Sequence, residues 1–215
     1  MANRYAELAF TPAIKAMQEK LGSRKTYERV EQSGNTNSQF GLAEKEFIST
    51  RDSFYMASVS ETGWPYVQFR GGPPGFLKVI DDHTVGFVDF RGNRQYISVG
   101  NLSRDDRVSL ILMDYPSRTR LKIMGRMEVH DGADSKPLIE TLRPPNYKAA
   151  MERAMLIHLE AFDWNCPQHI TPRYTEGEIR TVLEPLTTRL QVLERENKDL
   201  RERLQKMGVT SSGLP

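Results

Sequence analysis

Cysteine is almost absent from this sequence, because 215 residues include only Cys166. A single thiol cannot form an internal disulfide, which excludes the disulfide frameworks of small secreted proteins. The sequence also lacks an apolar run long enough to span a bilayer, and it lacks a secretory signal near its first residue. We therefore expect a cytoplasmic protein that has no membrane partner.

A strong charge of one sign is absent as well. The sequence has 30 Lys and Arg residues against 28 Asp and Glu residues, so its net charge is only +2. Nucleic-acid binding usually requires a clear basic excess. The four histidines are scattered and do not have the spacing of zinc ligands. We expect neither a nucleic-acid partner nor a structural metal.

Apolar residues that alternate with polar ones predict a block of β-strands between residues 54 and 130. The predicted strands are 54–60, 64–70, 76–80, 84–90, 108–115 and 121–130. Turn signals at regular spacing favour a six-stranded antiparallel barrel. A further alternating run starts at Ala154 and also predicts a strand. The fold class is therefore mainly β with flanking helices.

Helical spacing of apolar residues predicts helices around this block. The predicted helices are 12–21, 42–50, 93–102, 135–142 and 147–153. We expect residues 1–50 to be a helical segment that packs on the barrel, and residues 51–177 to be the barrel domain. Residues 178–207 are predicted to form a C-terminal helix, and residues 208–215 a disordered tail.

The most informative motif joins the strand 84–90 to the helix predicted from Asn93. Gly92 breaks the strand, and Arg91, Asn93, Arg94 and Gln95 supply donors at the joint. A helix N-terminus offers free N–H groups and a positive dipole end, which favour an anion. The motif indicates a phosphate site. Its simpler interpretation is a helix cap with solvated charges, which the motif alone favours slightly.

Two other segments could contribute to a binding site. Arg70 ends a predicted strand just before the Gly-Gly of 69–76 (FRGGPPGF), where a guanidinium could grip phosphate and the backbone could approach a ligand. Arg118, Arg120 and Lys122 start a later strand, and alternation places them on one face. The irregular segment 164–174 (WNCPQHITPRY) is either a binding loop or a rigid connector, and the sequence favours neither.

Three of these segments, together with the pair Gly125-Arg126 on a later predicted strand, resemble a known family. They are Arg-Gly-Gly-Pro at a strand end, Asn93-Arg94-Gln95, Gly125-Arg126, and the segment WNCPQHI. The region 47–174 resembles the pyridoxamine 5'-phosphate oxidase-like flavoproteins, and is most similar to their oxidase-related, FMN-binding branch. The resemblance implies a six-stranded split barrel. It also implies a homodimer with FMN at each of two subunit interfaces.

The resemblance further implies roles for individual residues. Arg94 and Gln95 match the Arg-Lys pair that holds the FMN phosphate, with Gln95 in place of Lys, and Arg120 matches a flavin-contacting Gln. The cofactor-binding residues expected from the motifs and the resemblance are Gln68, Phe69, Arg70, Gly71, Asp89, Asn93, Arg94, Gln95, Arg118, Arg120, Trp164 and Gln168. The oxidases' C-terminal Arg-x-His substrate motif has no clear counterpart, and the sequence identifies no catalytic acid or base.

The function expected from these features is that of an FMN-dependent oxidoreductase that transfers hydride through flavin N5. Its substrate would be a small molecule, with NAD(P)H as a candidate electron donor. One alternative is a flavin-binding or sensing protein without turnover. Another is a split barrel that uses a deazaflavin or haem.

The C-terminal segment has a separate pattern. Leucines with one Asn and one Met recur at alternating steps of three and four residues. They are Leu183, Leu186, Leu190, Leu193, Asn197, Leu200, Leu204 and Met207. This heptad pattern predicts a short parallel leucine zipper that starts near Pro185 and clamps the dimer. The alternative is one amphipathic helix folded back on its own barrel.

Overall fold

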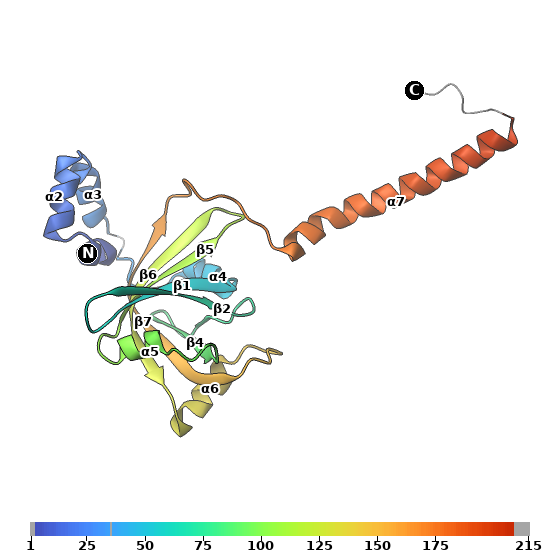
Figure 1. Cartoon of the computed structure of the whole chain (residues 1–215). Helices are drawn as coiled ribbons and strands as arrows, with labels where there is room; N and C mark the ends of the chain where they lie inside the picture. The colour runs from blue at the N-terminus through green and yellow to red at the C-terminus, as the bar shows by residue number, and fades with distance from the viewer. Residues whose placement is uncertain (1–2, 35, 209–215) are drawn as a thin grey trace. The chain divides into compact units, whose positions relative to one another are not determined.

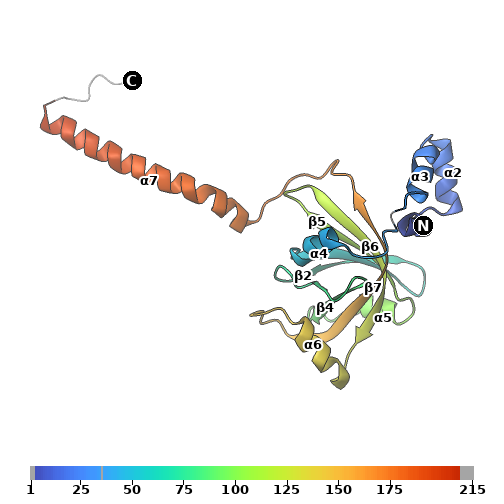
Figure 2. The same cartoon turned by 180° about the vertical axis from the view of Figure 1, so that it is seen from behind.

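The computed structural model describes residues 3–34 and 36–208, and it divides into two compact units. The first unit is residues 1–171 and the second is residues 172–215. Figure 1 and Figure 2 show the strands and the shorter helices in the first unit and one long helix in the second. The predicted tail 208–215 lies, apart from Gly208, outside the described residues.

One antiparallel sheet of seven strands forms the centre of the first unit. The strands are β1 (Ser53–Val59), β2 (Pro65–Gly71), β3 (Lys78–Val79), β4 (Thr84–Phe90), β5 (Arg107–Asp114), β6 (Thr119–His130) and β7 (Met151–Asn165). Their order is β2-β1-β5-β6-β7-β4-β3, and the edge strands β2 and β3 are not paired with each other. The sheet curls around its core (Figure 1) and stays open at one side, as a split barrel does. The mainly β, antiparallel prediction is confirmed.

The core follows the alternation that the sequence displays. Phe54 and Met56 on β1 point inward, as do Leu110 and Leu112 on β5, and all four are at most 1% exposed. The rings of Phe54 and Phe87 meet edge to face with centroids 5.3 Å apart. Burial of such side chains stabilises the fold by ~1.5–3 kcal/mol each. The inward faces of the strands therefore form one apolar core.

β7 is the longest strand and determines where the other elements meet. It pairs with β6 over nearly its whole length and with β4 over its first half. The β6–β7 register shifts between Met124 and Gly125, where an added Cβ would lie 2.6 Å from the His158 carbonyl oxygen. Only glycine allows the two backbones to approach so closely. The resulting bulge bends the sheet.

Short helices flank the sheet within the first unit, and one long helix belongs to the second unit. They are α1 (Arg4–Ala9), α2 (Pro12–Lys20), α3 (Arg24–Glu31), α4 (Leu42–Ser49), α5 (Ile97–Leu102), the 3-10 turn η1 (Ala133–Ser135), α6 (Lys136–Leu142) and, in the second unit, α7 (Glu176–Lys206). α6 packs against β4 and β7 and buries Leu142 against Val88 and Ala154. This second layer explains why β4 is buried on both faces over most of its length.

Several predicted boundaries were wrong. The helix predicted at 147–153 does not form, because Met151 already pairs with Phe90 as the start of β7. The strand predicted at 76–80 shortens to Lys78–Val79, since Phe76 and Leu77 enter the core without pairing. α1 and α3 were missed: α1 is short, and the strongly polar α3 buries no residue. Tertiary pairing overrides weak local preference at these places.

α7 forms the second unit with the linker before it. Its N-terminus is closed by a capping box, in which the Thr175 hydroxyl accepts from the Glu178 N–H at 3.2 Å and the Glu178 carboxylate accepts from the Thr175 N–H at 2.7 Å. The helix is predicted at 178–207 and is observed from Glu176, whereas the expectation that Pro185 confines its start is wrong, because the helix continues through Pro185. A strong cap upstream of the proline accounts for the earlier start.

Candidate functional site

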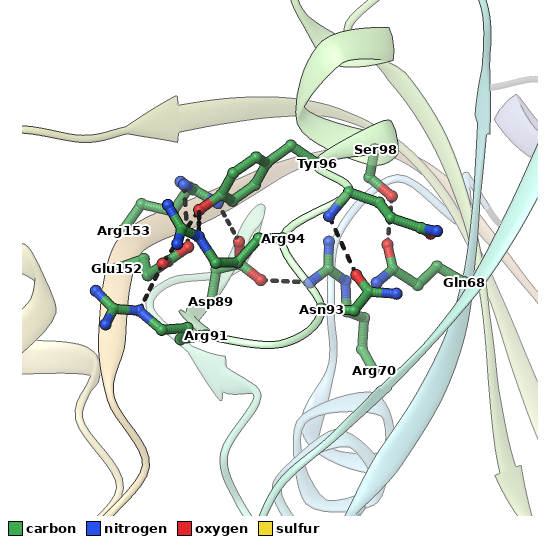
Figure 3. Close-up of polar contacts among 11 residues, drawn as sticks. Gln68, Arg70, Asp89, Arg91, Asn93, Arg94, Tyr96, Ser98, Glu152 and Arg153 are labelled. Atoms are coloured by element: carbon green, nitrogen blue, oxygen red, sulfur yellow. Dashed lines mark hydrogen bonds and ion pairs between the residues drawn. The ribbon is translucent and has the colours of Figure 1, made fainter.

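A polar hollow of about 270 Å³ lies among β2, the end of β4, the segment 92–99 and the start of β7. Figure 3 shows side chains from these four elements turned toward one another. Predicted residues that line it are Gln68, Arg70, Asp89, Asn93, Arg94 and Gln95. The structure therefore brings together half of the twelve predicted cofactor-binding residues.

Asp89 on β4 binds two arginines from different strands. One carboxylate oxygen pairs with Arg70 of β2, and the other accepts from Arg153 Nη1 at 2.7 Å (Figure 3). The Asp89 side chain is 6% exposed, so the pairs are shielded from water. Burial opposes the charge of Arg153, but Asp89 and Glu152 outweigh it and raise the pKa of that guanidinium. Asp89 thus holds both arginines, charged, beside the hollow.

Glu152 plays the same part for a second set of donors. It accepts from Arg91 Nε at 2.9 Å and from the Tyr96 hydroxyl at 3.3 Å, and Arg153 Nη2 lies 3.2 Å away. The hydrogen bond from Arg91, with the charge of Arg153, lowers the pKa of Glu152. Glu152 is therefore ionised at neutral pH and orients the donors around it.

Arg94 has the weakest restraint of the arginines. Its Nε donates to the Tyr96 hydroxyl at 3.3 Å, and its side chain is exposed. The Tyr96 ring in turn lies under the Arg153 guanidinium, 4.9 Å from ring centroid to Cζ. Arg94 can therefore turn toward a ligand without breaking a buried ion pair.

The six charged side chains described above, here called the arginine cluster, are Arg70, Arg91, Arg94, Arg153, Asp89 and Glu152. Four guanidinium groups face two carboxylates, which leaves a local excess of two positive charges. Within the described part of the chain, the buried Nε atoms of Arg70 and Arg153 have no hydrogen-bond partner. The cluster fits a phosphate monoester, which carries about −1.5 to −2 charges at neutral pH.

The backbone of the segment 92–99 differs from the prediction. The helix predicted from Asn93 begins only at Ile97, and Arg94 and Tyr96 have left-handed φ angles of 63° and 54°. α5 has six residues, and no side chain caps its N-terminus. An anion here would thus be bound by guanidinium groups, and the predicted contribution of a helix dipole at Asn93 is wrong. Left-handed non-glycine residues cost energy and often mark functional loops.

Buried hydrogen bonds fix α5 behind this segment. Ser98 Oγ donates to Gln68 Oε1 at 2.7 Å, and Asn101 Nδ2 donates to Ser58 Oγ at 3.0 Å. Ser98 and Asn101 are 1% and 8% exposed. The loop that carries Arg94 is therefore anchored at its C-terminal side to β1 and β2.

Two predicted residues lie on a neighbouring surface. Phe69 and Gly71 line a second, shallow hollow with Tyr147, beside the β2 edge. Phe69 is 58% exposed and meets Tyr55 of β1 edge to face at 5.6 Å. They alternate with Gln68 and Arg70 along β2 and therefore point to the opposite face of that strand.

The last four predicted residues lie at the other end of the sheet. Arg118 is in the β5–β6 turn, Arg120 on β6 pairs with Asn165 at the end of β7, and Gln168 follows in an exposed turn. Because the strand starts at Thr119, Arg118 does not share a strand face with Arg120 and Lys122, contrary to the prediction. Within one chain this group and the arginine cluster occupy opposite ends of β7.

Trp164 has a structural environment in its own chain. Its indole Nε1 donates to Glu44 Oε1 at 2.6 Å, and its ring meets Phe47 edge to face at 4.9 Å. These contacts tie α4 to the end of β7. The polar edge of the indole is therefore already in use within this chain.

Sequence reasoning missed three members of the site, Tyr96, Glu152 and Arg153. Asp89 stands directly opposite Arg153 across the β4–β7 ladder. The available signal was the charged pair Glu152-Arg153 just before the alternating run from Ala154. These two residues fall within the helix predicted at 147–153, so the sequence does not place them in the β4–β7 ladder.

The described residues were also compared with the requirements of a metal site and of a membrane-spanning helix. Among residues 3–34 and 36–208, no group of three or more His, Cys, Asp or Glu side chains could hold a metal ion. Over the same residues, each helix is too short or too polar to cross a bilayer.

This chain thus forms an open antiparallel barrel that has an arginine-rich polar hollow at its split side. A family model described as pyridoxamine 5'-phosphate oxidase matches residues 43–161, more than half of the chain. The chain belongs to the pyridoxamine 5'-phosphate oxidase family. No curated protein matches it.

Solved structures that match this chain have low sequence identity to it. A Clostridium acetobutylicum protein related to general stress protein 26, of the pyridoxinephosphate oxidase family, is 15% identical with a TM-score of 0.44, covering 64% of this chain and 95% of its own. An FMN-binding protein from Syntrophomonas wolfei is 11% identical with a TM-score of 0.42, covering 70% and 97%. An F420 reductase is 16% identical with a TM-score of 0.41, covering 55% and 94%. These likenesses add nothing to the family match.

Proposed function

We propose that this protein binds FMN with the phosphate in the hollow beside the arginine cluster and acts as an FMN-dependent oxidoreductase. The observation that carries the proposal is the excess of two positive charges in the arginine cluster beside the hollow. Guanidinium groups bind phosphate with short, charge-assisted hydrogen bonds. Membership in the pyridoxamine 5'-phosphate oxidase family supports the choice of a flavin phosphate over other anions.

Each residue has a specific task in this proposal. Arg70 and the exposed Arg94 hold the phosphate, while Asp89 and Glu152 keep the guanidinium groups in position. FMN, when bound, supplies the acceptance and donation of hydride at N5. The two carboxylates that line the hollow are both engaged by arginines. The chain thus contributes binding and electrostatics, and protons come from the substrate or water.

The proposal includes a homodimer in which two chains share each cofactor. A hollow of about 270 Å³ is smaller than the ~300–1,000 Å³ of ordinary small-molecule pockets, so one chain would enclose only part of FMN. Arg153 and Trp164 are eleven residues apart on β7, a path of roughly 36 Å along the strand at ~3.3 Å per residue. Arg118, Arg120 and Gln168 near that far end could contact the flavin only if they belong to a second subunit.

A titration of apoprotein with FMN and with riboflavin tests the phosphate assignment. Two charge-assisted contacts, each ~1.5–3 kcal/mol, should make FMN bind at least roughly 100-fold more tightly than riboflavin. Equal affinities would exclude the arginine cluster as a phosphate site. Inorganic phosphate should compete with FMN and not with riboflavin.

A visible spectrum of the purified protein tests the cofactor and the activity. Flavin bands that NADH or NADPH bleach would support the oxidoreductase. Flavin bands that neither nicotinamide bleaches would favour the non-catalytic flavin-binding protein. Both carboxylates of the hollow are engaged by arginines, which is compatible with that alternative. A deazaflavin or haem spectrum would contradict FMN.

A further inference from the structure

α7 carries one continuous apolar stripe whose residues are all exposed. Six leucines on it, and Met207 directly after its last residue, are between 42% and 76% exposed. They are Leu183, Leu186, Leu190, Leu193, Leu200, Leu204 and Met207. The 31-residue helix buries none of its side chains. So long a stripe needs a partner, because exposed apolar patches of this extent mark interaction surfaces.

The stripe follows a heptad repeat without interruption. Leu183, Leu190, Asn197 and Leu204 occupy a positions. Leu186, Leu193, Leu200 and Met207 occupy d positions. A 3.5-residue repeat keeps the stripe facing one partner helix, which is the geometry of a two-stranded coiled coil. The stripe therefore fits a second helix with the same repeat, and another copy of α7 provides one.

The charges beside the stripe favour a parallel pair. In a parallel pair a g residue of one helix lies near the following e residue of the other. Arg189 then faces Glu194 of the second copy, and Glu196 faces Arg201 of the second copy. Symmetry repeats both contacts, so four attractive pairs flank the stripe.

An antiparallel pair that overlaps the whole stripe brings like charges together. In that arrangement g residues face g residues, so that Arg189 meets Arg203 of the second copy and Glu196 meets Glu196. Like charges in such positions destabilise a helix pair. Asn197 would also face Leu193 of the second copy, and its amide would be buried without a partner.

A parallel pair also gives the buried Asn197 amide a hydrogen-bond partner. The two Asn197 side chains then occupy the same layer and can hydrogen-bond across the axis, which specifies two strands in register at some cost in stability. Pro185 occupies a c position on the outer side, where its ring cannot disturb the packing of the stripe. Every polar residue in the repeat is thus compatible with a parallel pair.

We propose that α7 is a homotypic docking surface that forms a parallel, two-stranded coiled coil with α7 of a second copy of this chain. This interaction is independent of the flavin site. It adds a second contact between two chains to that of the proposed barrel homodimer. When one contact has formed, the effective concentration of the partner surface for the other contact is raised.

Disulfide formation in the full-length protein tests the pairing and its direction. Cys166 is first replaced by Ser so that the introduced thiol is alone. Leu200→Cys, at a d position, should then form a disulfide between two chains under mild oxidation. In the antiparallel pair the two copies of residue 200 would be roughly 15 Å apart along the axis, too far for a disulfide. Glu202→Cys, at the outward f position of the same turn, is the matched control.

The two cysteine variants give a clear decision. A high yield of linked dimer from Leu200→Cys with little from Glu202→Cys supports the proposal. Equal yields, or no link from Leu200→Cys in soluble protein, would overturn it. Circular dichroism shows whether each variant keeps its helix content, and an FMN titration shows independently whether the flavin site is intact.

A charge exchange tests the g–e' contacts. Arg189→Glu in the Leu200→Cys chain should slow linking by roughly fivefold, because two attractive pairs become repulsive. Adding Glu194→Arg should restore the rate, since the opposite charges then face each other again. No slowing, or no recovery in the doubly exchanged chain, would show that these residues do not face each other.

Discussion

Arg70 on β2 forms an ion pair with Asp89 on β4, although β2 is at one edge of the sheet and β4 is next to the other edge. The pair joins the two sides of the split without backbone hydrogen bonds between them. Asp89 extends the link to Arg153 on β7 at 2.7 Å. One carboxylate therefore both closes the barrel at this point and positions the arginines of the hollow.

Asp89→Asn should destabilise the fold. The change leaves two arginines, 12% and 13% exposed, without their carboxylate, and breaking a buried ion pair costs about 3–5 kcal/mol. Urea denaturation measures the free energy of unfolding. Asp106→Asn is the control, because its partner Arg126 is 51% exposed and the pair is worth ~0–1 kcal/mol. Equal effects of the two changes would show that Asp89 is not a structural link.

Arg94→Ala should weaken FMN binding and leave stability nearly unchanged. The side chain is exposed and donates a hydrogen bond to the Tyr96 hydroxyl, whereas a charge-assisted phosphate contact is worth ~1.5–3 kcal/mol. FMN affinity should fall by roughly tenfold or more, and riboflavin affinity should not change. Arg104→Ala, which removes an exposed arginine 3.7 Å from Glu61, is the control. A similar loss in both variants would argue against a phosphate contact at Arg94.

The contribution of Glu152 should disappear in acid. The hydrogen bond from Arg91 lowers the pKa of Glu152 in the folded state, so its stabilisation is present above the unfolded pKa of ~4.3 and is lost as the pH falls through the lower folded value. Wild type should be more stable than Glu152→Gln at pH 7, and the difference should shrink toward pH 3. Thermal unfolding of both proteins across this range measures it. A difference independent of pH would mean that packing, and not charge, accounts for the effect.

Trp164→Phe should lower stability and change FMN affinity little. The variant keeps an aromatic contact with Phe47 but loses the indole donor to Glu44, a residue that is 9% exposed. Leaving a nearly buried acceptor without this donor costs about 1–3 kcal/mol. Chemical denaturation and FMN titration of the same preparation separate the two effects. A large loss of FMN affinity with unchanged stability would instead favour a direct flavin contact, as the resemblance implied.

Local signals in the sequence determined most of the strands and part of the site. Alternation located β1, β2, β4, β5 and β6 to within a residue or two, because each buries one face against a common core. Arg70 and Arg94 were expected near phosphate from the strand ends and turns beside them. The heptads likewise predicted α7, whose pattern is independent of tertiary contacts.

Only the tertiary structure decided which charged residues meet. Glu152 and Arg153 have no local pattern that distinguishes them, and they join the site because β7 pairs with β4. Arg70 and Asp89 come from opposite sides of the sheet order, so their contact depends on how the barrel curls. A loop with left-handed residues stands where the sequence predicts the start of a helix at Asn93, and the helix after it is anchored by contacts of Ser98 and Asn101 with distant strands. Sequence patterns report which face of an element is apolar, whereas ion pairs between distant strands form only when long-range pairing brings their charges together.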